Sequence, residues 1–245
     1  MDGLWIFFAF PLNLMIVLLW VTGCRWLWKV HPDCRVTRFL LSPAATISSM
    51  SLLLAACLWL GLTGHKGFVG SVFFAVIMLY VQTVLLLVVF RGWRTHEGKV
   101  RWRFLLLHAG LLIAIGAGFW GAPDTCERRV RLEKGQVTET AYGLDSKAAG
   151  LGFSLKLVGF DVDMSPSGTP AHYEAVVSVD GGSAVNITVN HPYGVRFDTD
   201  IYLAGISDGC CIFQIVRDPW RYVQLAGILM LLAGAFLLFI KGPGK

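Results

Sequence analysis

The sequence predicts a multi-pass membrane protein with about five transmembrane helices and an antiparallel β-sandwich-like domain inserted between the last two helices. Three observations support this fold class. Hydrophobic residues make up 55% of the 245 residues and charged residues only 15%, whereas a soluble domain is nearer a quarter charged. The charges gather beside long apolar runs or in one polar stretch, 122–220. Within that stretch, apolar and polar residues alternate as they do in β-strands.

Each of the apolar runs is long enough to cross roughly 30 Å of hydrocarbon as a helix. The five expected spans are Leu4–Thr22, Phe39–Leu62, Phe68–Phe90, Phe104–Trp120 and Tyr222–Ile240. In the first span we expect Pro11 to kink the helix, and Asn13 to need a hydrogen-bond partner within the bundle. The chain then divides into an N-terminal helix and loop (1–38), three helices (39–121), the β-domain (122–220) and a last helix with its tail (221–245).

The distribution of basic residues predicts the orientation of these spans. Loop 23–38 holds four Lys or Arg, loop 91–103 holds five, and the tail adds Lys241 and Lys245. Because loops rich in Lys and Arg stay on the cytoplasmic side, we expect the N-terminus and the β-domain outside and the C-terminus inside. The same topology explains the net charge of +5, so the charge does not indicate a nucleic-acid partner.

The residue pattern of the polar stretch 122–220 predicts a set of short β-strands. Phe153, Leu155 and Leu157 alternate with polar residues, and the apolar parity then flips at Phe160, which predicts a β-bulge near 158–159. Asp180, Gly181 and Gly182 form a tight-turn signal. Six or seven strands at this spacing favour an antiparallel sandwich, and we expect no helix in this domain.

Small residues recur on the two spans that flank the β-domain. They are Gly110, Ala114 and Gly118 in the fourth span, and Ala226, Gly227, Ala233 and Gly234 in the fifth. Stripes of this kind let helix backbones approach closely in lipid. We therefore expect these two spans to pack through them.

His108 is the one ionisable side chain inside the apolar part of the fourth span. Such a group is costly in lipid and usually marks function. Three readings stay open from the residues alone: a neutral imidazole bonded to another helix, a member of a proton relay, or an axial ligand of haem iron. The last reading requires a partner subunit, because one histidine fills only one of two axial positions.

Three cysteines lie in the polar stretch, on the side where oxidation is possible. Cys126 could pair with Cys210 or Cys211, which leaves two readings, a structural disulfide or a redox-active pair. The remaining histidines show no H-x₃-H or HExxH spacing, so a zinc site is not indicated. They are His31, His65, His96, His172 and His191. No nucleophile–base set is visible, and we predict no complete active site in this chain.

Five segments in fixed order carry a family resemblance. They are Arg103–Gly121, Gly152–Asp163 (GFSLKLVGFDVD), Pro170–Val179 (PAHYEAVVSV), Val189–Pro192 (VNHP) and Val216–Gly227 (VRDPWRYVQLAG). Their order and topology resemble the ResB-like (CcsB-type) proteins of System II cytochrome c biogenesis. The resemblance covers roughly residues 39–241.

This resemblance implies a bacterial inner-membrane subunit, with the N-terminus and β-domain periplasmic and the C-terminus cytoplasmic, that acts with a CcsA-like membrane protein in haem transport and attachment to apocytochrome c. It implies haem b shared with the partner, with His108 as one axial ligand of the iron. The chain has no CcsA-like portion, so it would be at most the accessory haem-delivery subunit of a haem lyase. The alternative function is a non-catalytic, membrane-anchored binding or assembly module without haem, in which His108 is a packing residue.

Overall fold

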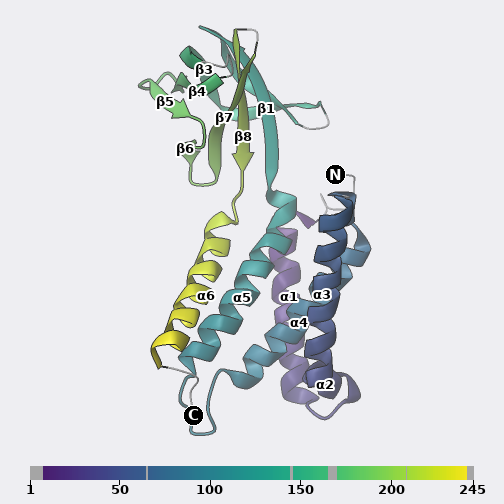
Figure 1. Cartoon of the computed structure of the whole chain (residues 1–245). Coiled ribbons are helices and arrows are strands. Elements are labelled where there is room, and N and C mark those ends of the chain that lie inside the picture. Colours follow the sequence, from purple (N-terminus) through teal and green to yellow (C-terminus); the bar gives the residue numbers. More distant parts are fainter. Residues whose placement is uncertain (1–7, 65, 144–145, 165–169, 208, 242–245) are drawn as a thin grey trace. The chain divides into compact units, whose positions relative to one another are not determined.

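The computed structural model describes residues 8–64, 66–143, 146–164, 170–207 and 209–241 (Figure 1). The chain divides into two compact units. One contains the residues up to Pro123 together with those from Trp220 onward, and it is helical. The other is Asp124–Pro219 and consists of β-strands.

The described part of the helical unit contains six α-helices. They are α1 (Leu12–Val30), α2 (Arg35–Leu40), α3 (Pro43–Thr63), α4 (Val72–Gly92), α5 (Trp102–Gly121) and α6 (Arg221–Lys241). Single 3₁₀ turns follow α3 and α5, at η2 (Lys66–Phe68) and η3 (Ala122–Asp124). Within the described residues, four helical segments are long and apolar enough to cross a membrane: Pro43–Thr63, Val72–Gly92, Trp102–Asp124 (α5 with η3) and Arg221–Ile240. The chain is therefore a membrane protein.

The first two expected spans need correction. The helix α1 begins at Leu12, and Pro11 precedes its first turn instead of kinking it, because at that position the N–H that proline lacks would have no acceptor within the helix. The helix runs on to Val30 past two basic side chains, and it is not among the four membrane-crossing candidates. The expected start at Leu4 lies outside the described residues. The count of five spans thus becomes four in the part of the chain that the structure describes.

The second expected span is divided at Ser42 and Pro43. The Ser42 side chain accepts a hydrogen bond from the backbone N–H of Ala45, and Pro43 occupies the first turn of α3. A serine N-cap followed by proline is a strong start signal for a helix. The residues before Ser42 form the separate short helix α2 instead of extending α3.

The contact between α5 and α6 is the most extensive helix–helix contact in the described part of the chain, and Figure 1 shows the two helices side by side. A Cβ atom at Gly227 would lie 2.6 Å from the backbone nitrogen of Ala114, and one at Gly110 would lie 2.8 Å from that of Leu231. A Cβ at Gly234 would lie 2.9 Å from Leu107. The expected packing through small residues is confirmed, because only glycine allows this separation.

Hydrogen bonds donated by side chains connect α1, α4 and α5 to one another. Asn13 Nδ2 donates to the carbonyl oxygen of Trp120 at 3.0 Å, and Trp120 Nε1 donates to Gln82 Oε1 at 2.9 Å. Trp20 Nε1 donates to Thr83 Oγ1 at 3.0 Å. Asn13 thus has the partner within the bundle that its position required.

The β-unit is one antiparallel sheet in the order β5-β4-β3-β2-β1-β8-β7-β6. Its strands are β1 (Cys126–Glu133), β2 (Val137–Gly143), β3 (Ala148–Met164), β4 (Pro170–Val179), β5 (Val185–Thr188), β6 (Tyr193–Arg196), β7 (Thr199–Ser207) and β8 (Cys210–Arg217). This corrects the expectation of a two-sheet sandwich of six or seven strands. The 3₁₀ turn η3 also falls within the stretch where no helix was expected.

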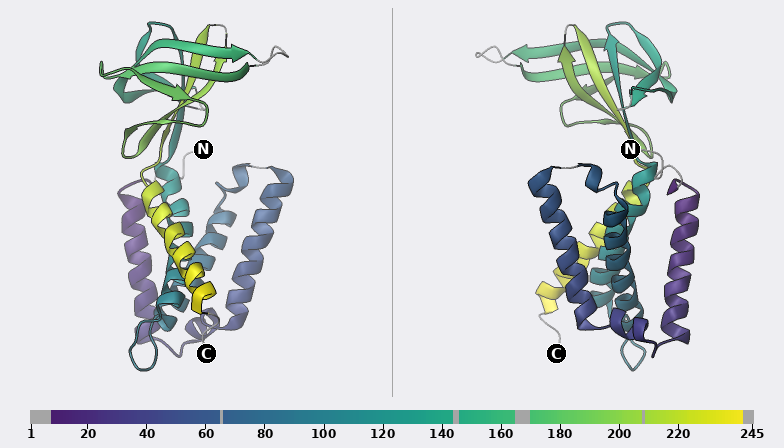
Figure 2. Two further views of the ribbon diagram at one scale, coloured as in Figure 1. Left: turned by 60° about the vertical axis from the view of Figure 1, so that its left-hand side comes forward. Right: turned by 90° about the vertical axis from the view of Figure 1, so that its right-hand side faces the viewer.

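The reason for a single sheet lies in the long strand β3. It pairs with β2 and with β4, and Figure 2 shows β3 and β4 running side by side over most of their length. The register between them shifts between Leu157 and Gly159, which confirms the expected bulge. The strands β4 and β5 also contact β7, so the sheet curls around one core. Fully buried members of that core include Leu132, Leu155, Leu157, Val177, Ile187, Ile201 and Phe213.

Candidate functional site

His108 lies in the second turn of α5, and its ring is held in a defined orientation. Its Nδ1 atom is 2.9 Å from the carbonyl oxygen of Phe104. A carbonyl oxygen only accepts, so Nδ1 carries the proton in the neutral ring and Nε2 keeps its lone pair. The imidazole also stacks on the Phe104 ring, with centroids 4.0 Å apart and planes 21° apart. The structure thus fixes the tautomer in which Nε2 is available to a metal or a proton.

The half-buried His108 borders a cavity of about 530 Å³. Basic side chains and an indole line it near the start of α5, and aliphatic side chains of α5 and α6 line the rest. The lining residues are Val100, Arg101, Trp102, Arg103, Phe104, Leu107, His108, Leu237 and Leu238. An apolar space with two guanidinium groups suits an amphiphile whose charged end is anionic.

The residues that line this cavity fit haem in one respect: His108 can supply one axial ligand to the iron. Histidines that bind metals usually donate their other ring N–H to a carbonyl or carboxylate, as His108 does to Phe104. Among the described residues of α1 and α3 to α6, His108 is the one histidine. A second histidine ligand from this bundle is therefore absent in the described helices, and an iron held by two histidines would need one from elsewhere.

A second and larger pocket, of about 870 Å³, shares Arg101 and Phe104 with the His108 cavity. It lies between the end of α1, the end of α4, the loop 93–101 and the start of α5. Its lining consists of Trp28, Val88, Phe90, Arg91, Gly92, Trp93, Arg94, Thr95, His96, Arg101 and Phe104. The residue pattern alone does not reveal this pocket, because membrane topology already accounts for the basic cluster at 91–103. The signal that could have found it is the alternation of Arg and Trp in that loop.

The three cysteines of the β-unit are not brought together. Cys126 is opposite Arg217, whereas Cys211 is opposite Leu132 at the other end of the β1–β8 ladder. Six strand residues span about 20 Å, and a disulfide needs Cα atoms within about 7 Å. The pairing of Cys126 with Cys210 or Cys211 is thus excluded by the register, and none of the six cysteines is in a disulfide. Burial, followed by the neighbouring Cys210, raises the pKa of the Cys211 thiol to about 11, which disfavours the reactive thiolate.

The other histidines lie apart from His108. His31 follows the end of α1 and meets the Trp26 ring edge-on at 4.7 Å between centroids. His96 lines the larger pocket, His172 is on β4 and His191 follows β5. His65 lies outside the described residues. Within the described ranges, no group of three or more His, Cys, Asp or Glu side chains could hold a metal ion.

The segments Val189–Pro192 and Arg217-Asp218-Pro219 both have structural roles in the β-unit. In Val189–Pro192, Asn190 has a φ of 65° and the His191 backbone N–H bonds to the Thr188 carbonyl at 3.1 Å, so the segment turns the chain from β5 to β6. In the Arg217-Asp218-Pro219 step, Arg217 Nε donates to Asp198 Oδ2 at 2.7 Å. This hydrogen bond lowers the pKa of the Asp198 carboxyl. Both motifs are explained by the architecture of the sheet.

The fold defines the class of this protein: a multi-pass membrane protein with an antiparallel β-domain inserted between two closely packed helices. Residues 98–212 match the model of the ResB-like family. The resemblance is therefore confirmed, and the matched segment contains His108 and most of the sheet. This match supports a role in cytochrome c biogenesis.

Among solved structures, the chain is similar to one described as the cytochrome c haem lyase CcmF. The identity is 12% and the TM-score 0.41, over 95% of this chain and 45% of that chain. The present chain thus spans less than half the length of that protein. No curated protein matches the sequence.

Proposed function

We propose that this protein is the ResB-like subunit of a cytochrome c maturation complex of System II. It passes haem across the membrane with a CcsA-like partner and presents apocytochrome c. His108 is one axial ligand of the haem iron, and the partner supplies the other. In this proposal the β-domain is periplasmic, the C-terminus is cytoplasmic, and the chain is the accessory haem-delivery subunit.

The observation that carries this proposal is the fixed tautomer of His108 beside an amphiphilic cavity. The Phe104 carbonyl oxygen accepts the Nδ1 proton at 2.9 Å and so directs the lone pair to Nε2. When bound, haem would supply an iron centre for that nitrogen. The stacked Phe104 ring prevents the imidazole from rotating freely. Arg101 and Arg103 offer positive charge for the porphyrin carboxylates, and Leu107, Leu237 and Leu238 exclude water.

The experiment that tests this function follows haem attachment in cells that lack a maturation system of their own. The full chain, a CcsA-like partner and a CxxCH reporter apocytochrome are expressed together, and covalent haem on the reporter is measured. We expect attachment only when both membrane proteins are present, and a loss of at least about tenfold with His108→Ala. His31→Ala is the matched control and should attach haem like the wild type. Attachment that does not depend on this chain would contradict the proposal.

A second function is favoured by one observation. The bond from Nδ1 to Phe104 stays within one helix, and a purely structural histidine would make the same contact. In this alternative the chain is a membrane-anchored binding or assembly module without haem. It predicts that His108→Gln, which keeps a hydrogen-bonding side chain, retains full function in the attachment assay. An axial ligand would not be replaced by glutamine, so this variant separates the two functions.

A further inference from the structure

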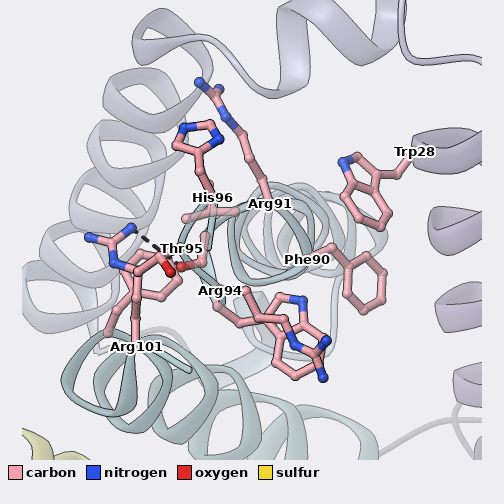
Figure 3. Close-up of a pocket in the computed structure, with 11 residues that line it drawn as sticks. Trp28, Phe90, Arg91, Arg94, Thr95, His96 and Arg101 are labelled. Atoms are coloured by element: carbon pink, nitrogen blue, oxygen red, sulfur yellow. Dashed lines mark hydrogen bonds between the residues drawn. The ribbon is translucent and has the colours of Figure 1, made fainter. Parts of the chain in front are cut away.

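The larger pocket has a strongly cationic lining. Figure 3 shows Arg91 and His96 next to each other on one side, Arg101 on a second side, and Trp28 facing Phe90 across from them. We call this site the basic pocket; its cationic residues are Arg91, Arg94 and Arg101. No carboxylate is among its described lining residues. Glu97, in the same loop, is exposed and pairs with Lys99 at 3.0 Å.

The guanidinium groups keep donors for a ligand. Arg91 makes one hydrogen bond, to the Leu41 carbonyl oxygen at 3.3 Å, and Arg101 makes one, to that of Gly92 at 3.3 Å. Arg94 lies over the Trp93 ring, with its central carbon 4.0 Å from the ring centroid. Each guanidinium has five N–H donors, and its fork geometry matches phosphate oxygens. The pocket thus presents uncompensated charge and unused donors in one place.

The rest of the lining is apolar and lies at the ends of the spanning helices. Trp28 and Phe90 form a wall with ring centroids 6.0 Å apart, and Val88 and Phe104 extend it. The pocket lies where α4 ends at Gly92 and α5 starts at Trp102. The ends of helices that span a membrane lie at the depth of the lipid headgroups, with acyl chains on the apolar side. Basic pockets between membrane helices are typical binding sites for anionic headgroups.

We propose that the basic pocket binds an anionic phospholipid. The phosphate contacts Arg91 and Arg94, and the glycerol and first acyl methylenes pack on Trp28 and Phe90. This site is distinct from the proposed ligand position at His108, although the two share the Arg101 and Phe104 walls. It requires the membrane-spanning helices but neither haem nor a partner protein.

The test titrates the purified full chain in a neutral detergent with phosphatidylglycerol or phosphatidylcholine and counts bound lipid by native mass spectrometry. Arg91→Gln/Arg94→Gln removes two pocket charges and leaves the His108 cavity lining intact. Arg25→Gln/Arg35→Gln is the matched control, since both residues are exposed and neither lines the pocket. We expect wild type and control to prefer phosphatidylglycerol, and the pocket variant to bind it at least about tenfold more weakly.

A second variant distinguishes weaker lipid binding from a failure of the protein to fold. Arg91→Lys/Arg94→Lys keeps the charge and the topology but loses the bidentate fork, so we expect a several-fold weaker affinity for phosphatidylglycerol. Equal binding of the two lipids, or equal losses in the pocket and control variants, would overturn the proposal. Displacement of bound lipid by millimolar inorganic phosphate alone would overturn the lipid assignment in favour of a free anion. Haem that binds the pocket while phosphatidylglycerol does not would overturn it in favour of a porphyrin. None of these results depends on His108, so they leave the proposed function separately testable.

Discussion

The two units of this protein place their large apolar side chains in opposite ways. In the helical unit many of them point outward: Phe239 of α6 is 87% exposed and Leu62 of α3 is 86% exposed. In the β-unit, Leu155, Leu157 and Phe213 are fully buried. The first pattern is suited to lipid, which is as apolar as the side chains it contacts, and the second is suited to water. One chain thus uses two different means of holding itself together.

The difference lies in which atoms touch. The α5–α6 pair is held where backbones meet at Gly110, Gly227 and Gly234, because lipid provides no hydrophobic drive to bring the helices together. The β-unit is held by interlocking side chains in a core that water surrounds.

The largest effect is expected for Leu155→Ala in the β-unit. Removal of a fully buried leucine side chain leaves a cavity and should cost about 3 kcal/mol in the free energy of unfolding. Hydrogen exchange of the β-strand amides measures it. Leu232→Ala in α6 is the matched control: this leucine is 62% exposed and should change the unfolding free energy very little. Similar losses in both variants would break the proposed contrast.

The next effect is expected for Gly227→Ala. Its Cβ would lie 2.6 Å from the Ala114 backbone nitrogen, so α5 and α6 must separate. We expect a loss of about 2 kcal/mol, measured by reversible unfolding of the chain in mixed micelles. Gly61→Ala in α3 has open space around the new methyl group and serves as the control. A tolerated Gly227→Ala would show that backbone contact does not hold this pair.

A smaller effect is expected for Asn13→Ala in α1. It removes the bond to the Trp120 carbonyl oxygen at 3.0 Å and should cost about 1 kcal/mol, measured in the same micelles. Thr22→Ala in the same helix is a suitable comparison, because the Thr22 hydroxyl bonds only within α1. Equal stabilities of the two variants would mean that the link from α1 to α5 contributes nothing.

The smallest effect is expected for Asp198→Asn, and it depends on pH. The Arg217 hydrogen bond lowers the pKa of Asp198 in the folded state. A lowered pKa stabilises the fold above the unfolded value, about 4, and this stabilisation is lost as the pH falls through the folded value. Since Arg217 is largely exposed, we expect a loss of about 1 kcal/mol or less at neutral pH. Hydrogen exchange of β7 and β8 should show the difference at pH 7 and a smaller one near pH 3.

Local patterns in the sequence were sufficient for part of this structure. Hydropathy located α4, α5 and α6, and the parity flip after Leu157 located the bulge. The predicted kink at Pro11 is wrong, because a proline is compatible both with a kink inside a helix and with the position just before the first turn of a helix. Only the structure distinguishes these two, and it shows the second.

Long-range pairing was beyond local patterns. The single sheet depends on β1 lying against β8, which joins residues 126–133 to 210–217, and no local alternation encodes that register. The same pairing keeps Cys126 away from Cys211. The sequence singled out His108, but its cavity also needs Leu237 and Leu238, which lie more than a hundred residues further along the chain.

The central claim is that His108 binds the haem iron, and the haem content of the purified complex tests it most directly. The full chain is co-purified with a CcsA-like partner, and haem is quantified by its reduced absorbance spectrum for wild type, His108→Ala and His31→Ala. We expect His108→Ala to lose about one haem per complex, since it removes one axial ligand, and His31→Ala to keep the wild-type content. An unchanged spectrum and haem content in His108→Ala would contradict the account.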